Sequence, residues 1–91
     1  MTWHKINYGA AENENGTRVT RTGFRTMTYK RDGREVTIDV EAGSGTLGVY
    51  ARSISKWDDA SAIDEDERSK ILADVMAALR VLRVPIKVLW V

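Results

Sequence analysis

The chain has 91 residues and no cysteine, which is enough for one domain and excludes a disulfide framework and thiol chemistry. Hydrophobic residues make up 43% of it and charged residues 30%, as in globular domains, and no stretch approaches the ~20 apolar residues of a membrane span. The net charge of +1 indicates no class of partner, but residues 57–70 hold six acids against Arg68 and Lys70. The start of the chain lacks the apolar core of a secretory signal, so we expect a cytoplasmic protein.

The N-terminal quarter of the chain carries the weakest pattern. Trp3, Ile6 and Tyr8 alternate in a way that allows one short strand. Residues 9–16 are polar and bounded by glycines, which favours a mobile loop. Residues 18–22 either extend the next strand or form a strand of their own.

A β-hairpin is the strongest local prediction. Asp32-Gly33 is a preferred two-residue loop, because a type I′ turn needs a positive φ at both central positions. This turn fixes the register of residues 24–31 against 34–41, with one largely apolar face and one polar face. The expected pairs are Arg31–Arg34, Tyr29–Val36, Met27–Ile38 and Arg25–Val40 on the first face, and Lys30–Glu35, Thr28–Thr37 and Thr26–Asp39 on the second.

One strand and one long helix are predicted after the hairpin. A glycine-rich turn at 43–45 leads into a strand over 47–53, which makes the sheet an antiparallel meander. After a polar linker, Asp64 is the expected N-cap of a helix, and Glu67 completes a capping-box spacing. The helix should run to residue 82 or 83, because Pro85 prevents its continuation. Its apolar stripe comprises Ile71, Leu72, Val75, Met76, Leu79 and Leu82.

Residues 86–91 predict a final strand, which is apolar at every position except Lys87. Such a run is typical of a strand that is covered on both faces or lies in the middle of a sheet. Because it follows a helix that crosses the sheet, this strand can run parallel to its neighbour. The predicted fold is a single α+β domain over residues 1–91, ordered β-β-β-α-β with a possible extra N-terminal strand.

Few residues could carry out catalysis, so we expect a non-enzymatic protein without a cofactor. His4 is the only histidine, which makes a histidine-based metal site or a catalytic triad improbable. The acidic cluster over residues 58–67 has no EF-hand spacing, so it is interpreted as helix capping or as a contact surface for a basic partner. Trp57 is either an anchor of the linker on the core or an interface hot spot. The candidate partner-binding residues are Trp57, Asp58, Asp59, Glu65 and Asp66.

A basic set on the hairpin offers an alternative function. Phe24 and Tyr29 lie between these basic residues, so the set could bind a nucleic acid through its charges and rings. Tyr29 falls on the apolar face, however, and neighbouring acids dilute the positive charge. The candidate nucleic-acid-binding residues are Arg21, Arg25, Lys30, Arg31 and Arg34.

Four segments between Asp32 and Val88 together carry a family resemblance: the strand Gly33–Glu41, the pair Trp57-Asp58, the helix start Glu67-Arg68-Ser69-Lys70-Ile71-Leu72, and Ala77-Ala78-Leu79. With them, this stretch resembles a family of small bacterial immunity proteins of polymorphic toxin systems, the immunity protein seventy-four family. The resemblance implies a protein that binds and neutralises a cognate toxin inside the producing cell.

Three functions therefore remain open, with a binding protein first. The leading interpretation is an immunity protein whose acidic segment contacts a basic toxin. The first alternative is a nucleic-acid-binding module that uses the basic hairpin. The second is a structural or assembly subunit that pairs, as a dimer for example, through an exposed strand edge.

Overall fold

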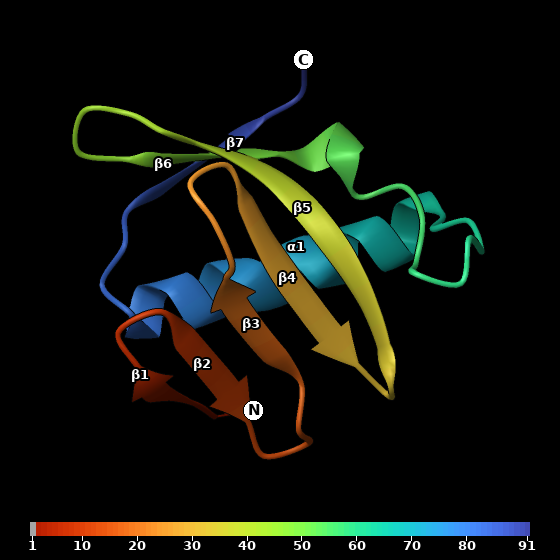
Figure 1. Ribbon diagram of the computed structural model, residues 1–91, viewed down its shortest axis with the longest axis horizontal. Coiled ribbons are helices and arrows are strands. Elements are labelled where there is room, and N and C mark those ends of the chain that lie inside the picture. Colours follow the sequence, from red (N-terminus) through yellow and green to blue (C-terminus); the bar gives the residue numbers. More distant parts are fainter. Residues whose placement is uncertain (1) are drawn as a thin grey trace.

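The computed structural model describes residues 2–91 as a mixed α+β fold, a curled seven-stranded sheet with one helix on one of its faces (Figure 1). The strands follow one another across the sheet in the order in which they occur in the chain. Every neighbouring pair is antiparallel except the last, in which β7 runs parallel to β6. The strands are β1 (Trp3–Asn7), β2 (Ala10–Asn13), β3 (Arg18–Arg21), β4 (Thr26–Arg31), β5 (Arg34–Ala42), β6 (Leu47–Tyr50) and β7 (Ile86–Leu89).

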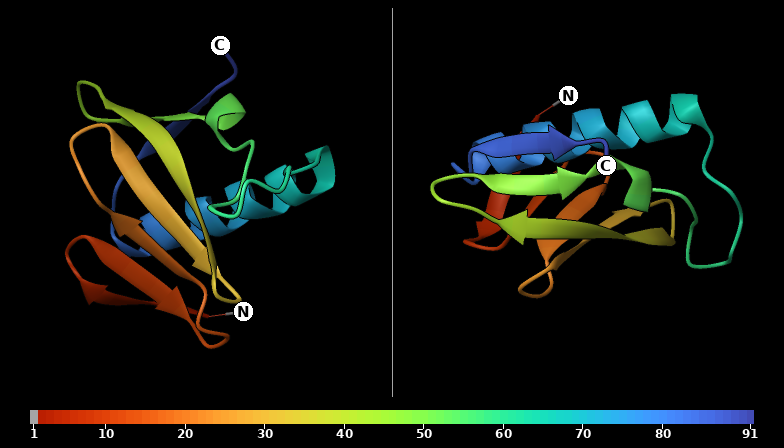
Figure 2. Two further views of the ribbon diagram at one scale, coloured as in Figure 1. Left: turned by 45° about the vertical axis from the view of Figure 1, so that its right-hand side comes forward. Right: turned by 90° about the horizontal axis from the view of Figure 1, so that it is seen from above.

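The predicted hairpin is confirmed as β4 and β5, and its six strand pairs have the predicted register. Asp32 has φ of 53° and Gly33 of 76°, as a turn with two left-handed residues requires. The side chains of these strands alternate between the core and an open face. No helix of the described residues covers this open face (Figure 2). Threonines and charged residues occupy this open face, so one side of the sheet is polar.

The helix α1 (Glu65–Val81) begins and ends where local chemistry dictates. The Asp64 side chain caps it by accepting a hydrogen bond of 2.8 Å from the Glu67 backbone N–H, as predicted. At its C-terminus, Arg83 adopts a left-handed φ of 61°, and the Val84 N–H donates to the Leu79 carbonyl. This arrangement is a Schellman motif, which satisfies the last carbonyls and turns the chain toward β7.

The core lies between the helix and the concave face of the sheet. Its largest fully buried side chains come from both layers, among them Tyr29 and Met27 of β4 and Ile71 and Leu79 of α1. Met76 is exposed although the apolar stripe included it. None of the helices in residues 2–91 has the length and apolar character needed to cross a membrane.

The first part of the sheet differs from the predicted one. Residues 10–13 form β2 where a loop was expected, so six strands precede the helix. The prediction failed because this strand has only four residues, and its two small apolar residues, Ala10 and Ala11, are adjacent and both buried, so the sequence shows no alternation. The strand expected over 47–53 ends at Tyr50, and a 3₁₀ turn, η1 (Ala51–Ser53), follows it.

The position of the last strand is also a correction. Its apolar sequence predicted a central or doubly covered strand, yet β7 lies at one edge of the sheet. Only the parallel pairing with β6 agrees with the prediction. Ile86 and Val88 nevertheless pack against the core from this edge position, whereas Trp90 and Val91 beyond the strand are 50% and 87% exposed.

Candidate binding surface

The loop before the helix holds the acidic residues that the sequence singled out, and two of them organise this loop. Asp58 pairs with β5, because its backbone N–H donates to the Glu35 carbonyl and its side chain accepts from the Glu35 N–H at 3.3 Å. Asp59 accepts a hydrogen bond of 2.9 Å from the Ser61 N–H and lies 3.5 Å from Arg34. Hydrogen bonds from Ser61, and then the charge of Arg34, hold the pKa of Asp59 below its usual value.

The other two acids lie on the first turn of α1. Glu65 forms an ion pair with Arg68 while its own side chain stays 84% exposed. The Asp66 side chain is exposed and has no hydrogen bond or ion pair within the described residues. Both acids suit the positive end of the helix dipole. The four carboxylates therefore share one side of the molecule, but three of them already have partners within the chain.

Trp57 is an anchor of this loop in the core. Its side chain is only 3% exposed, and its indole Nε1 donates to Glu67 Oε1 at 3.1 Å. The guanidinium groups of Arg34 and Arg31 lie 4.5 Å and 5.5 Å from the centre of the ring. The anchor interpretation is therefore confirmed, and the indole bonds to a carboxylate. In this conformation the side chain is not presented to a partner.

The basic residues of the predicted hairpin do not form one patch. Arg31 and Arg34 lie at the Trp57 end of the sheet, where Arg31 also forms an ion pair of 3.2 Å with Glu67. Lys30 is exposed on the open face, directly opposite Glu35 in the neighbouring strand. Arg21 and Arg25 lie at the opposite end of the sheet, where both are exposed. The set is thus divided between the two ends of β4.

Two exposed aromatic side chains mark that opposite end of the sheet. Tyr8, in the β1–β2 turn, is 89% exposed, and Phe24, in the β3–β4 turn, is 87% exposed. Together with Arg21, they line one shallow hollow of about 430 Å³. We call Tyr8, Arg21, Phe24 and Arg25 the aromatic end of the sheet.

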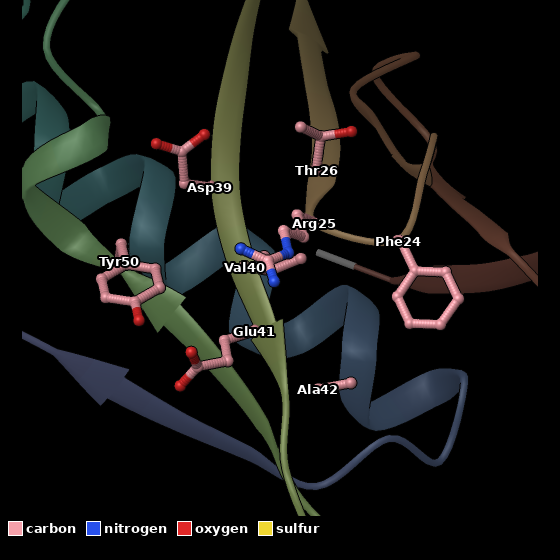
Figure 3. A pocket seen from close by; sticks show the side chains of 8 residues that line it. All are labelled: Phe24, Arg25, Thr26, Asp39, Val40, Glu41, Ala42 and Tyr50. Atoms are coloured by element: carbon pink, nitrogen blue, oxygen red, sulfur yellow. The ribbon is translucent and has the colours of Figure 1, made fainter.

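A second hollow of about 670 Å³ adjoins the first and opens on the polar face (Figure 3). Phe24 belongs to both hollows, and β5 and β6 contribute Asp39, Glu41 and Tyr50 to the second. The Tyr50 hydroxyl points toward the Glu41 carboxylate, and desolvation together with Glu41 raises the pKa of Tyr50. The hollow thus combines aromatic rings with charges of both signs, since Arg25 lies between Phe24 and the two acids.

Phe24, Arg21 and Arg25 were expected only as parts of a basic hairpin, and Tyr8 was expected in a strand. The available signal was an aromatic residue beside a glycine in each of two turns, Tyr8-Gly9 and Gly23-Phe24. An apolar ring at a turn has no neighbouring strand to cover it. The topology was needed to show that the two turns lie at the same end of the sheet.

The titratable side chains of the described part of the chain give no metal centre. Among residues 2–91, no three His, Asp or Glu side chains gather closely enough to hold an ion. His4, on the edge strand β1, pairs with Glu12 of β2 across the sheet. Comparisons of the chain with models of protein families, with curated proteins and with solved structures found no match.

Proposed function

We propose that this chain is a non-enzymatic protein-binding domain and that the aromatic end of its sheet is the contact surface. The observation that carries the proposal is the exposure of Tyr8 and Phe24 side by side on one hollow. Transfer of a large apolar side chain from water to an interface contributes about 2–3 kcal/mol. Exposed aromatic side chains that cluster in this way mark interaction sites on soluble proteins.

The polar groups around the two rings favour a protein over a nucleic acid. Arginine and tyrosine are enriched at the energetic centres of protein interfaces, and Arg21, Arg25 and Tyr50 surround Phe24. Asp39 and Glu41 lie in the same hollow as Arg25, where they would repel a phosphate backbone. A protein surface with charges of both signs can complement this arrangement.

The more specific form of the proposal is that the partner is a toxin, which the chain neutralises by binding. The resemblance of residues 32–88 to immunity proteins supports this form. A neutralising protein needs a preformed surface more than a reaction centre, and short turns of a seven-stranded sheet hold Tyr8 and Phe24 in place. The acidic side of the molecule, with Glu65 and Asp66 exposed, is the second candidate surface for such a partner.

Single-stranded nucleic acid is the second candidate ligand. The adjacency of Phe24 and Arg25 favours it, because a base can stack on an exposed ring while an arginine binds the phosphate. Such binding would weaken steeply with salt. A protein that binds through the two apolar rings would keep most of its affinity at high salt.

The test is capture of a partner from a lysate of the source cells, at low and at high salt. The bait is the wild-type chain, the double variant Tyr8→Ser/Phe24→Ser, or a charge-reversed variant at Asp58, Asp59, Glu65 and Asp66. Met76→Ser, which changes an exposed apolar side chain on the helix, is the matched control. We expect one protein on the wild-type and control baits but not on the double variant, and we expect the wild-type chain to suppress the toxicity of that protein.

Each other outcome of the capture has a definite meaning. If only the charge-reversed bait loses the partner, the contact surface is the acidic side of the molecule. Recovery of nucleic acid that high salt releases would favour the second candidate. A partner that binds but is not toxic would remove the toxin-neutralising form of the proposal and leave the binding function.

A further inference from the structure

The two edges of the sheet are protected to different degrees. A strand edge exposes unpaired backbone N–H and C=O groups, and natural proteins blunt such edges with bulges, charges or short strands. The pairing of β1 shifts register between Lys5 and Asn7, and most of its side chains are exposed and polar. The β1 edge is therefore blunted by an irregularity and by its composition.

The β7 edge lacks these protections, apart from its shortness and Lys87. Ile86, Val88 and Leu89 are all half-buried, because β6 flanks this strand on one side only. The apolar sequence continues beyond the strand with Trp90, which is half exposed. Arg52 Nε donates to the Trp90 carbonyl at 3.0 Å, so the backbone is already held in position past the end of β7. The edge is thus both apolar and preorganised.

The register of β6 against β7 decides which backbone groups face outward. Leu47 pairs with Ile86, and its N–H donates to the Pro85 carbonyl at 2.9 Å. In a parallel ladder the groups that face a given neighbour belong to alternate residues. The N–H and C=O groups of Lys87 therefore face β6, and those of Ile86 and Val88 face the open edge.

We propose that β7 pairs antiparallel with β7 of a second copy of this chain, with Val88 opposite Val88 of that copy at the twofold axis. This register uses the outward-facing groups of Ile86 and Val88, since an antiparallel bonded pair exchanges both of its hydrogen bonds. It places Lys87 opposite Leu89 of the second copy and Ile86 opposite its Trp90. A register centred on Lys87 would instead oppose two like charges.

A second copy fits this edge better than an unrelated strand because the edge is self-complementary. A twofold axis through Val88 brings Ile86 and Val88 of both copies together on the face that packs against the core and separates the two lysines. The pairing joins two seven-stranded sheets into one continuous sheet. Only about five residues of each chain take part, so the dimer is weak and depends on concentration.

The test is sedimentation equilibrium of the full chain over a wide range of concentrations. We expect a monomer–dimer equilibrium for the wild type. Leu89→Lys places a lysine opposite Lys87 twice in each dimer and should raise the dissociation constant at least about tenfold. Lys87→Leu removes the charge and should lower the dissociation constant of the dimer. Ile6→Lys makes the same kind of change at an exposed apolar residue of β1, and it should leave the dissociation constant unchanged.

Amide hydrogen exchange in the same samples identifies the edge without any substitution. The amides of Ile86 and Val88 should gain protection as the concentration rises, whereas those of Lys87 and Leu89 are protected at every concentration by β6. A chain that stays monomeric throughout would overturn the proposal. So would a dimer that Ile6→Lys disrupts and Leu89→Lys does not, or a dimer in which the Val88 amide remains unprotected.

Discussion

The indole N–H of Trp57 donates a hydrogen bond of 3.1 Å to Glu67, which joins the loop before the helix to the first turn of the helix. Glu67 also forms an ion pair with Arg31 at the end of β4. One carboxylate therefore holds the loop, the helix and the sheet together at this end of the molecule. Its position follows from the N-cap at Asp64, which places the third helical residue against the ring.

Substitution of Glu67 should destabilise the fold more than substitution of its neighbour Glu65. Glu67→Ala leaves the buried Trp57 N–H and the Arg31 guanidinium without their shared acceptor, which costs about 1–3 kcal/mol. Glu65→Ala removes one exposed ion pair and should cost less than about 1 kcal/mol. Urea unfolding of both variants measures the difference, and equal losses would contradict the bridging role of Glu67.

The pair Tyr29–Asp74 should make stability depend on alkaline pH. The Tyr29 hydroxyl donates to Asp74 Oδ2 at 2.6 Å, and burial followed by this hydrogen bond raises the pKa of Tyr29 well above that of an exposed tyrosine. The pKa of Tyr29 is therefore higher in the folded state than in the unfolded state. This contribution to stability is complete below about pH 10 and is lost as the pH rises above it.

Tyr29→Phe provides the comparison for that pH dependence. The variant should be less stable than the wild type at neutral pH, because Asp74 loses its hydrogen-bond donor. Its free energy of unfolding should fall less steeply between about pH 10 and pH 12. Denaturant unfolding at a series of pH values would show this as two curves that converge, and parallel curves would contradict it.

An alanine at Gly48 should couple energetically to Leu89 of the neighbouring strand. A Cβ atom at Gly48 would lie 2.8 Å from Leu89 Cδ1, closer than such contacts occur, so Gly48→Ala must displace that side chain. Because Cδ1 is the far end of a flexible, half-buried side chain that can rotate away, we expect a loss of no more than about 1 kcal/mol. The double variant Gly48→Ala/Leu89→Ala should lose less than the sum of the two single variants. A double-mutant cycle from thermal unfolding measures this coupling, and additive losses would contradict the contact.

Substitution of the two exposed aromatic residues should leave the fold intact. Tyr8 and Phe24 are almost fully exposed, so Tyr8→Ser and Phe24→Ser should each change the free energy of unfolding by no more than about 0.5 kcal/mol. Thermal unfolding of the two single variants is the measurement. A large loss from either one would mean that its ring supports the fold rather than an interface.

The middle of the chain was predictable because independent local rules agree there. The Asp32-Gly33 turn and the alternation of side chains both specify the same register, and the structure has it. The capping residue Asp64 and the acids that follow it likewise predicted the start of the helix. These features depend on neighbours in the sequence, so no tertiary information was needed.

The edges of the sheet and the candidate surface were not predictable, because they depend on the order of the strands. An apolar run such as residues 86–91 is typical of a central strand, and only the topology places β7 at the edge. Likewise, Tyr8 and Phe24 are separated along the chain and meet only because two turns share one end of the sheet. The burial of Trp57 was left open for the same reason, since its polar sequence neighbours obscure its contacts with Arg31 and Arg34.

The most direct test of protein binding at the aromatic end is the affinity of the captured partner, measured by titration calorimetry. The wild-type chain and three variants, Tyr8→Ser/Phe24→Ser, Met76→Ser and Asp66→Lys, are compared at one ionic strength. We expect the double variant to bind at least about a hundredfold more weakly, because two interface aromatic residues at ≥1.4 kcal/mol each correspond to that ratio. Met76→Ser should bind as the wild type does. Undiminished binding by the double variant, with loss in Asp66→Lys instead, would contradict the assignment of the surface.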